Sequence, residues 1–353
     1  MKLTCREVVF LLVFVVVVVL GAKPHTHPMQ EHDPNAEFIC KGRLGEVAAC
    51  LCNDSAEEIA CVNAQFVDVH VFEQINTPYP GIKKVTFHGN NFQDLPDAPL
   101  FGPYIHDDLR VLNISANYIV NLNSNALKGA PNIRVLDLSN NEIVLKKNDV
   151  GFLSHTPKLT HLHLRRAFTA SVNRTIQFSL MMQMFEQANL KNLKYIDLSY
   201  NYLTSVPYNL PCPFPSLAVL DFRQNLLKSL QMNVSCLSSL ANLDLSRNHF
   251  RFLDQNFTRK FANYMPPQSI TLRNYFDCGC NTEYLVWLRS TNTVREKNIL
   301  TCHRASPSSF NGAKLVEVQT NLLTCPNGDY EMNLASQLNS LVGLIAVVYL
   351  LLI

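Results

Sequence analysis

One pattern, L-x-x-L-x-L-x-x-N-x-L, recurs along the middle of the chain and restricts its fold more than any other feature. Seven copies of this pattern begin at Ile82, Leu109, Ile133, Leu159, Leu193, Leu217 and Leu240. Successive starts are 27, 24, 26, 34, 24 and 23 residues apart. One copy cannot bury its own leucines, whereas stacked copies bury a continuous core. The chain is therefore expected to build its core by stacking similar coils.

Each position of the pattern has a physical task. Leucines at positions 4 and 6 lie two residues apart on a short strand, so they point into the same interior. The asparagine at position 9 turns the chain and bonds buried backbone groups, and only the fourth copy lacks it, with Ala167 instead. The pattern is identified as a leucine-rich repeat. It predicts an α/β leucine-rich-repeat solenoid over residues 82–265, curved, with parallel strands on the concave face and an insertion at about 167–192.

The first 22 residues are typical of a secretory signal peptide, because two basic residues precede a short apolar run. That run, Val8 to Leu20, spans ~20 Å as a helix, which is short of a ~30 Å hydrocarbon core. A membrane anchor is the alternative. Cleavage would leave a His-rich leader over residues 23–39 and would remove Cys5. Ten cysteines then remain, an even number that suits an oxidising compartment.

The last residues have the order of a GPI-attachment signal. Asn327, Gly328 and Asp329 form a small-residue site, residues 326–340 a polar spacer, and residues 341–353 a hydrophobic tail. A short single-pass transmembrane helix at the C-terminus is the alternative. Both interpretations place the protein on the extracellular face of the cell membrane, attached by its C-terminus. Secretion also agrees with five N-glycosylation sequons, at Asn53, Asn113, Asn173, Asn233 and Asn256.

Two cysteine clusters flank the repeats and predict caps over residues 40–81 and 266–325. The clusters are Cys40, Cys50, Cys52 and Cys61, and Cys278, Cys280, Cys302 and Cys325. Disulfides are favoured over a metal site in an oxidising compartment. Four cysteines allow three pairings, and a Cys50–Cys52 ring would be strained, so the interleaved and nested pairings both stay open from the residues alone.

The caps of leucine-rich-repeat families imply the interleaved pairing. It joins Cys40 to Cys52, Cys50 to Cys61, Cys278 to Cys302, and Cys280 to Cys325. Two further cysteines, Cys212 and Cys236, occupy almost the same place in adjacent coils. Coils stack at about one strand spacing, ~4.8 Å, which lies within the Cα range of a disulfide. A Cys212–Cys236 bridge is expected, with two buried free thiols as the alternative.

The C-terminal cap and the insertion resemble the trophoblast glycoprotein family. In the cap the shared cues are Trp287-Leu288-Arg289, Thr291, Val294, Lys297, Leu300 and Thr301-Cys302. The second cue is the Asn-Arg-containing insertion VNRTIQFSLMMQMFEQANL. This resemblance implies a cell-surface glycoprotein that dampens Wnt signalling. That family has a full transmembrane helix and a cytoplasmic tail, neither of which is expected here, so any activity that needs the tail is in doubt.

The concave face is the expected recognition surface. Side chains at positions 3, 5 and 7 point away from the leucines. The candidate protein-binding residues in the later repeats are His161, His163, Arg165, Tyr195, Asp197, Asp221, Arg223, Asn242 and Asp244. The aspartates at position 5 are explained either by solvation and neighbouring hydrogen bonds or by docking of a basic or polar partner surface. A glycan on Asn113 would obstruct the front half of the concavity and direct protein binding to repeats four to seven or to an outer face.

Other sites are weighed against simpler interpretations. His161 and His163 beside Asp137 and Asp197 could ligate zinc or form a pH-sensitive contact, but nothing indicates an enclosed pocket, so no metal is expected. In the insertion, Phe178, Met181, Met182 and Phe185 have the spacing of an amphipathic helix. That helix either packs on the flank of the solenoid or offers a Met-rich docking surface.

Composition and motifs exclude several classes of function. Lys and Arg number 30 against 28 Asp and Glu, which lacks the charge footprint of a nucleic-acid binder. Motifs of hydrolases, zinc proteases and dinucleotide enzymes are missing, so we expect no catalysis, cofactor or small-molecule substrate. We expect a cell-surface glycoprotein that binds an extracellular or membrane protein, by resemblance a negative regulator of Wnt signalling and a binder of a Wnt-pathway component. The alternative is an adhesion or matrix-contact module without a signalling role.

Overall fold

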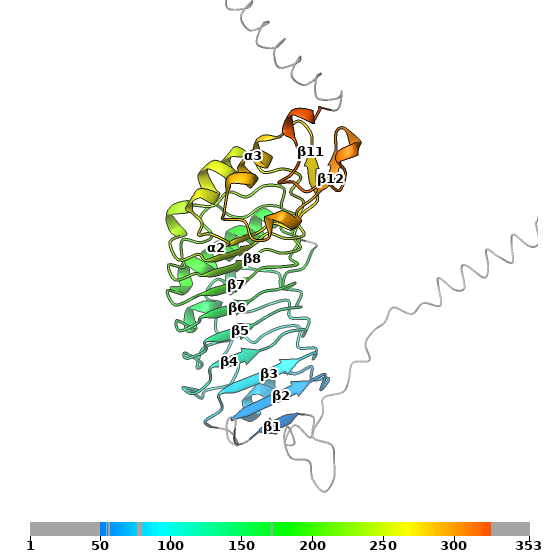
Figure 1. Cartoon of the computed structure of the whole chain (residues 1–353). Helices are drawn as coiled ribbons and strands as arrows, with labels where there is room; N and C mark the ends of the chain where they lie inside the picture. Colours follow the sequence, from blue (N-terminus) through cyan, green and yellow to red (C-terminus); the bar gives the residue numbers. More distant parts are fainter. Residues whose placement is uncertain (1–49, 54, 56, 76–79, 171, 326–353) are drawn as a thin grey trace, which may run out of the picture.

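The computed structural model describes residues 50–325, except residues 54, 56, 76–79 and 171 (Figure 1). The predicted signal peptide, the leader, Cys40, the GPI site, the spacer and the hydrophobic tail lie outside the described residues. Within them, no helix has both the length and the apolar character needed to cross a membrane.

A single long sheet runs through the molecule, with strand order β1 to β10 (Figure 1). Strands β1 and β2 pair antiparallel, and every later pair in this sheet is parallel. Its strands are β1 Leu51–Asn53, β2 Glu58–Val62, β3 Lys84–His88, β4 Val111–Asn113, β5 Val135–Asp137, β6 His161–His163, β7 Tyr195–Asp197, β8 Val219–Asp221, β9 Asn242–Asp244 and β10 Ile270–Thr271. The predicted leucine-rich-repeat solenoid is confirmed, and its sheet continues into both predicted caps.

Helices lie in several of the connections between strands, whereas the described connections from β3 to β4, from β4 to β5 and from β7 to β8 contain none. The α-helices are α2 Arg174–Ala188 and α3 Glu283–Ser290. The 3-10 helices are η2 Val69–Ile75, η3 Lys147–Asp149, η4 Phe152–His155, η5 Val234–Cys236, η7 Ala262–Tyr264, η8 Lys297–Ile299, η9 Ser308–Phe310 and η10 Thr320–Leu322, and η6 Asn256–Phe261 is a π-helix. A small second sheet pairs β11 Phe276–Cys278 with β12 Cys302–Ala305.

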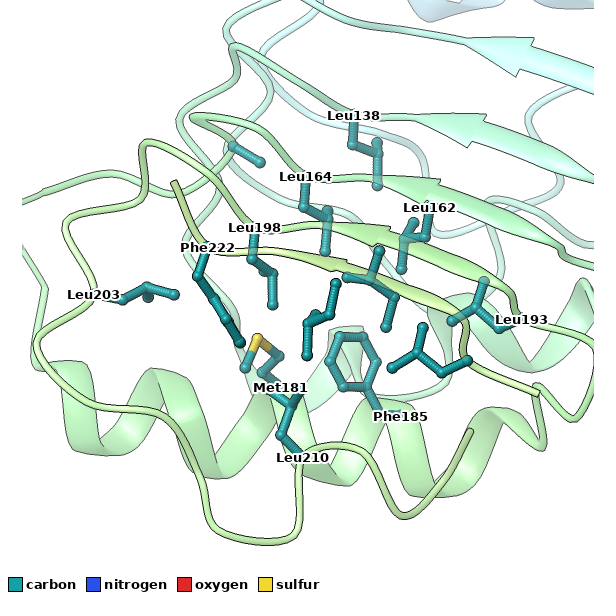
Figure 2. Packing of buried hydrophobic residues seen from close by; sticks show 14 of the residues in the cluster. Leu138, Leu162, Leu164, Met181, Phe185, Leu193, Leu198, Leu203, Leu210 and Phe222 are labelled. Atoms are coloured by element: carbon teal, nitrogen blue, oxygen red, sulfur yellow. The ribbon is translucent and has the colours of Figure 1, made fainter. Parts of the chain in front are cut away.

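The leucines of the repeats form one continuous core, as predicted. In the third repeat Leu136 is fully buried and Leu138 nearly so, while the strand residues on either side of Leu136 are only half-buried. The same alternation recurs in β3, β4, β6 and β9, whereas in β7 and β8 the aspartate at position 5 is buried as well. The buried apolar side chains meet in the interior of the solenoid (Figure 2). The strand residues opposite the leucines therefore line the concave face.

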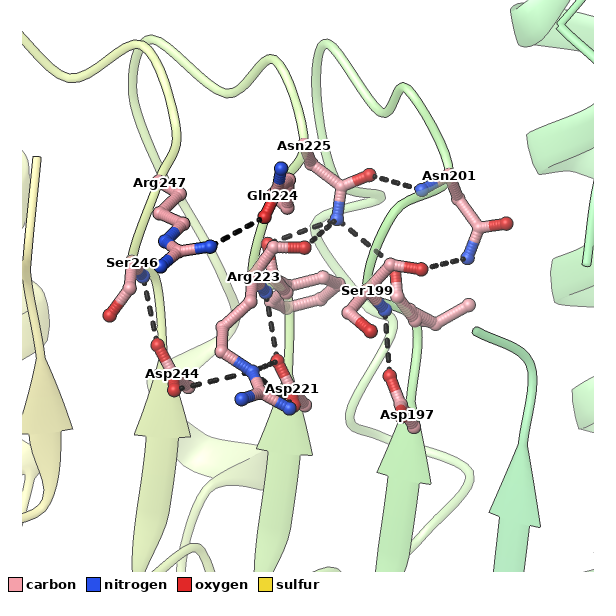
Figure 3. Close-up of polar contacts among 12 residues, drawn as sticks. Asp197, Ser199, Asn201, Asp221, Arg223, Gln224, Asn225, Asp244, Ser246 and Arg247 are labelled. Carbon is pink, nitrogen blue, oxygen red and sulfur yellow. Dashed lines mark hydrogen bonds and ion pairs between the residues drawn. The ribbon is translucent and has the colours of Figure 1, made fainter. Parts of the chain in front are cut away.

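The asparagines at position 9 form a buried ladder along the turns that follow the strands. The carboxamide oxygen of Asn225 accepts hydrogen bonds from the backbone nitrogens of Asn201, at 2.9 Å, and Leu203, at 3.0 Å. Its amide nitrogen donates to the carbonyl oxygens of Leu198 and Phe222 (Figure 3). Ala167 has no side-chain amide, so the ladder is interrupted in the fourth repeat.

Helix α2 confirms the predicted helix in the insertion. The Asn173 side chain caps its start by accepting hydrogen bonds from the backbone nitrogens of residues 175 and 176. The buried face differs from the predicted one: Met181, Met184, Phe185 and Ala188 point into the core, whereas Phe178 and Met182 are only partly buried. The helix therefore packs on the solenoid through its methionines (Figure 2).

Disulfides lie near both ends of the solenoid. Cys50 is joined to Cys61, Cys278 to Cys302, and Cys280 to Cys325. Cys52 is also disulfide-bonded, and its predicted partner, Cys40, lies outside the described residues. The three described pairs agree with the interleaved pairing that the resemblance to leucine-rich-repeat caps implies, and the Cys40–Cys52 pair stays a prediction. Between adjacent coils, Cys212 is joined to Cys236, with their Cα atoms 4.9 Å apart, close to one strand spacing.

Candidate functional site

The structure brings the nine candidate binding residues together on the concave face of β6 to β9 and the turns that follow. Position 3 of these strands aligns His161, Tyr195, Val219 and Asn242 in register. Position 5 aligns His163, Asp197, Asp221 and Asp244. Arg165 and Arg223 follow β6 and β8 and are exposed. We call these nine residues the concave patch.

Three aromatic rings form the N-terminal part of the concave patch. The Tyr195 ring stacks on His161, with ring centroids 5.7 Å apart, and leans on His163 at 5.0 Å. Burial, and then the nearby Asp197 carboxylate, raises the pKa of Tyr195 to about 12. Burial, with smaller contributions from His163 and Lys194, lowers the pKa of His161 below its ordinary value. His161 and Tyr195 are therefore uncharged at neutral pH.

The aspartates of position 5 have a structural task. In each, one carboxylate oxygen accepts a hydrogen bond from the backbone nitrogen two residues later, at 2.8 to 2.9 Å. Asp137 bonds Ser139 in this way. Figure 3 shows the other three pairs, which are Asp197 and Ser199, Asp221 and Arg223, and Asp244 and Ser246. Asn113 makes the same bond to Ser115. These bonds satisfy a backbone group at the point where each strand ends. The column is thus explained first by turn formation.

Arg223 neutralises much of the acidic column. Its guanidinium lies 2.6 Å from a carboxylate oxygen of Asp221 and 3.5 Å from one of Asp244 (Figure 3). Burial raises the pKa of Asp221, and the hydrogen bonds from Arg223 oppose that shift. The concave patch is therefore less acidic than its sequence suggests, and it combines neutral rings with paired charges.

Two residues outside the predicted set extend the patch. The Arg165 guanidinium lies 4.4 Å from the centre of the Tyr200 ring. Arg295, from the C-terminal cap, donates a hydrogen bond of 2.7 Å to the side-chain oxygen of Asn242. Tyr200 falls at position 8, which the alternation rule does not assign to the concave face, and Arg295 comes from 53 residues further along the chain. No periodic signal could identify either residue.

The N-terminal half of the concave face carries two sequons. In the sheet, Asn53 of β1 pairs with Glu58 of β2, and Glu58 pairs with Lys84 of β3. Lys84 pairs in turn with Val111, which occupies position 3 of β4. Asn53 therefore shares the concave face with Asn113 of β4. The other three sequons lie at Asn173, Asn233 and Asn256, at or beside the starts of α2, η5 and η6. None of the five falls on β6 to β9.

The histidines of the concave patch do not complete a metal site. Among the described residues, no group of three or more His, Cys, Asp or Glu side chains is arranged to hold a metal ion. His161 is stacked on Tyr195, and its Nδ1 lies 2.9 Å from the hydroxyl of Thr160. The rings therefore contact other side chains of the concave face instead of forming a metal centre.

Comparison with known proteins agrees with this architecture. The sequence matches the leucine rich repeat over residues 80–143, 107–166 and 192–213. It is 25% identical over 290 residues to trophoblast glycoprotein of Macaca fascicularis. The aligned region covers 79% of this chain and 67% of that relative. Chaoptin of Drosophila melanogaster is 30% identical over 174 residues, or 49% of this chain and 12% of chaoptin.

A solved structure shares the fold. Human trophoblast glycoprotein, also called Wnt-activated inhibitory factor 1, superimposes with a TM-score of 0.62 at 21% identity. The match covers 80% of this chain and 100% of that one. The chain is thus a leucine-rich-repeat protein with a distant, family-level similarity to trophoblast glycoprotein. Leucine-rich-repeat proteins are typically non-enzymatic modules that bind other proteins, and this disulfide-rich chain is related to extracellular glycoproteins.

Proposed function

We propose that this protein is a cell-surface glycoprotein that binds a protein partner through the concave patch. By its resemblance to trophoblast glycoprotein, we further propose that it is a negative regulator of Wnt signalling acting through its ectodomain. The observation that carries the first proposal is the unequal concave face. Two sequons occupy its N-terminal half, whereas β6 to β9 present a sequon-free surface of rings and paired charges.

The chemistry of the concave patch suits a protein rather than a small molecule. It is an open strip, and its tyrosine and arginines are side chains enriched at the centres of protein interfaces. His161, Tyr195 and Arg223 come from three different coils that are fixed by the continuous core. A rigid surface loses little conformational entropy on binding.

A glycan provides the sharpest test of this surface. Residues 244–246 read Asp-Leu-Ser, so the single substitution Asp244→Asn creates a sequon at the last residue of β9. The new amide oxygen can keep the hydrogen bond to Ser246, as Asn113 does with Ser115 in β4. A glycosidase-sensitive mass increase verifies that the site is occupied.

The matched control is Asp244→Asn with Ser246→Ala. It removes the same carboxylate, but it cannot be glycosylated. The Ser246 hydroxyl is buried without a hydrogen-bond partner in the described structure, so its loss costs little. We expect the glycosylated variant to lose the partner in surface proximity labelling and to lose repression of a Wnt reporter, whereas the control retains both.

Different outcomes separate the two parts of the proposal. If the occupied glycan leaves partner labelling unchanged, the concave patch is not the binding surface. If the glycan removes a partner but the wild-type protein does not change the Wnt reporter, the patch stands and the regulatory role falls. An adhesion or matrix partner recovered by labelling would then favour the contact module.

A further inference from the structure

The turns that follow the strands form an edge of the solenoid with a strongly one-sided charge. We define the strand-exit edge as residues 165–170, 199–204, 223–228, 246–251, 273–278 and 302–306. It contains eight cations and one carboxylate: Arg165, Arg166, Arg223, Lys228, Arg247, Arg251, Arg273, Arg304 and Asp277. The equivalent positions of the first three repeats, residues 88–93, 115–120 and 139–144, contain no Lys or Arg. The near-neutral net charge of the chain hides this segregation.

Backbone hydrogen bonds make the strand-exit edge continuous. The nitrogen of Arg166 donates to the carbonyl of Ser199, and that of Tyr200 donates to Arg223. The nitrogen of Arg247 donates to Arg273. In the cap, β11 and β12 place Asp277 beside Arg304. The cations therefore form a row along successive coils, which over about five coil steps of ~4.8 Å spans ~24 Å.

Most of this positive charge is uncompensated. Arg223 pairs with Asp221 and Asp244 on the concave face, and Arg273 pairs with Glu296. In the part of the chain that the structure describes, no carboxylate lies within ion-pair distance of four of these cations, which are Arg165, Arg166, Lys228 and Arg247. Arg165 instead covers the Tyr200 ring, and Arg247 donates a hydrogen bond to the side chain of Gln224 (Figure 3). The row thus keeps an excess of positive charge.

Arg251 and Arg304 share a single carboxylate. Asp277 lies 3.8 Å from Arg251, and it accepts hydrogen bonds from Arg304 of 2.8 and 3.3 Å. One carboxylate cannot balance two guanidiniums, so this pair adds a further net positive charge. Asp277 also holds both guanidiniums in place, which reduces the entropy that they would lose on binding an anion.

The surface is hollowed beside these cations. One hollow is lined by residues that include Lys228, Arg251, Phe252 and Asp254, whose carboxylate accepts a hydrogen bond from the backbone nitrogen of Phe257. A second is lined by residues that include Arg251, Phe252, Asp277 and Arg304. The two hollows share Arg251 and Phe252, so they adjoin at these two residues, and together we call them the groove. The Phe252 side chain is 43% exposed, and Tyr275 beside the groove is 64% exposed. The groove therefore combines guanidiniums with accessible aromatic faces.

We propose that the strand-exit edge binds a sulfated glycosaminoglycan chain. Guanidinium groups bind sulfate and phosphate oxygens through parallel hydrogen bonds, and a row of separate cations matches a linear polyanion with charges at intervals. Exposed aromatic rings suit the apolar faces of saccharide rings. None of the five sequons lies on this edge, so N-glycans leave it accessible. This surface adjoins the concave patch and shares Arg165 and Arg223 with it, but the three arginines tested below, Arg247, Arg251 and Arg304, lie outside the patch. The proposal therefore does not depend on the proposed partner.

The test uses the full-length protein purified from the cells that express it, with a heparin dodecasaccharide as the probe. The edge variant is Arg247→Gln, Arg251→Gln and Arg304→Gln. The matched control removes the same charge elsewhere, from three exposed lysines without an ion pair: Lys128→Gln, Lys147→Gln and Lys260→Gln. We expect the edge variant to bind heparin at least about tenfold more weakly than the wild-type protein. The number of ions released on binding, taken from the slope of log Kd against log salt concentration, should fall by about three. The control should change by less than about twofold.

Three results would overturn the proposal. The first is no binding of wild-type protein to heparin at about 0.15 M salt. The second is an equal loss in the edge variant and the control, which indicates a nonspecific effect of net charge. The third is tighter binding to polyglutamate, to a thymidine oligonucleotide or to fully desulfated heparin, which would assign the edge to another anion. Thermal unfolding checks both variants, and Arg247→Gln alone replaces the edge variant if that variant is unfolded.

Discussion

Removal of one rung of the asparagine ladder should destabilise the solenoid strongly. Asn225 is 2% exposed and bonds four backbone groups of two coils. Asn225→Ala leaves the nitrogens of Asn201 and Leu203 buried without this acceptor. Each unsatisfied buried donor costs about 1–3 kcal/mol, so we expect the free energy of unfolding to fall by about 2–6 kcal/mol. The two carbonyl groups add less, because an oxygen has a second lone pair.

Chemical denaturation measures this loss. Far-UV circular dichroism follows the whole solenoid, and the fluorescence of Trp287, the single tryptophan, follows the C-terminal cap. Coincident transitions with an unchanged dependence on denaturant would indicate that the repeats still unfold as one unit. A separate early transition would show that the coils beside Asn225 open first, as nearest-neighbour coupling in a repeat array allows.

Two further variants separate the hydrogen bonds from other effects. Asn192 is exposed and makes one long hydrogen bond to a carbonyl, so Asn192→Ala should change stability by less than about 0.5 kcal/mol. Asn225→Asp keeps both acceptor contacts but buries a carboxyl, whose pKa should rise. Its deficit should therefore shrink on acidification, unlike that of Asn225→Ala. Equal stability of Asn225→Ala and Asn192→Ala would refute the reasoning.

Three further predictions concern the cap, the pH dependence and membrane attachment. Replacing Cys278 and Cys302 together by serine should cost about 2–5 kcal/mol in the same unfolding assay, and a smaller loss than about 1 kcal/mol would show that the cap does not depend on this bridge. Burial lowers the pKa of His106. As the pH falls, the unfolded chain therefore takes up a proton on this side chain before the folded chain does, and the free energy of unfolding should decrease below about pH 6.5. His106→Gln should flatten this pH dependence between about pH 7 and pH 5, and an unchanged slope would contradict the prediction. Phosphatidylinositol-specific phospholipase C should release the protein from intact cells; retention, with the tail beyond residues 327–329 still detected by mass spectrometry, would instead establish a transmembrane tail.

The periodic part of the structure was predictable because each coil repeats one physical problem. Leucines two residues apart must share an interior, and a turn at position 9 needs an amide, so Leu136, Leu138 and Asn141 could be placed from the pattern alone. The same alternation predicted which strand residues face the concavity. The structure accordingly places the residues of the concave patch, which come from four different repeats, on neighbouring strands and the turns after them; their role in binding stays a prediction.

The remaining features depend on information that no repeat carries. Asn53 reaches the concave face because β1 pairs antiparallel with β2, a register set by the cap and not by the repeat pattern. The buried face of α2 was displaced because apolar residues surround much of that helix, so the predicted Phe178 stripe and the observed Met184 stripe both satisfy helical spacing. The charge of the strand-exit edge was missed because net charge averages over all faces.

The hydrogen bonds of the asparagine ladder run in one direction along the chain. The backbone nitrogen of Asn90 requires Asn117, that of Asn117 requires Asn141, and that of Asn248 requires Asn274. Each coil is thus completed by the coil that the ribosome makes next, about one to five seconds later at about 5–20 residues per second. The last coil of the growing solenoid therefore has backbone nitrogens without their acceptors until Asn274 and the C-terminal cap have been synthesised. A chain released before this point would keep an unpaired end that can associate with other chains. Loss of the C-terminal cap should therefore be the most direct way to make this protein a substrate for quality control.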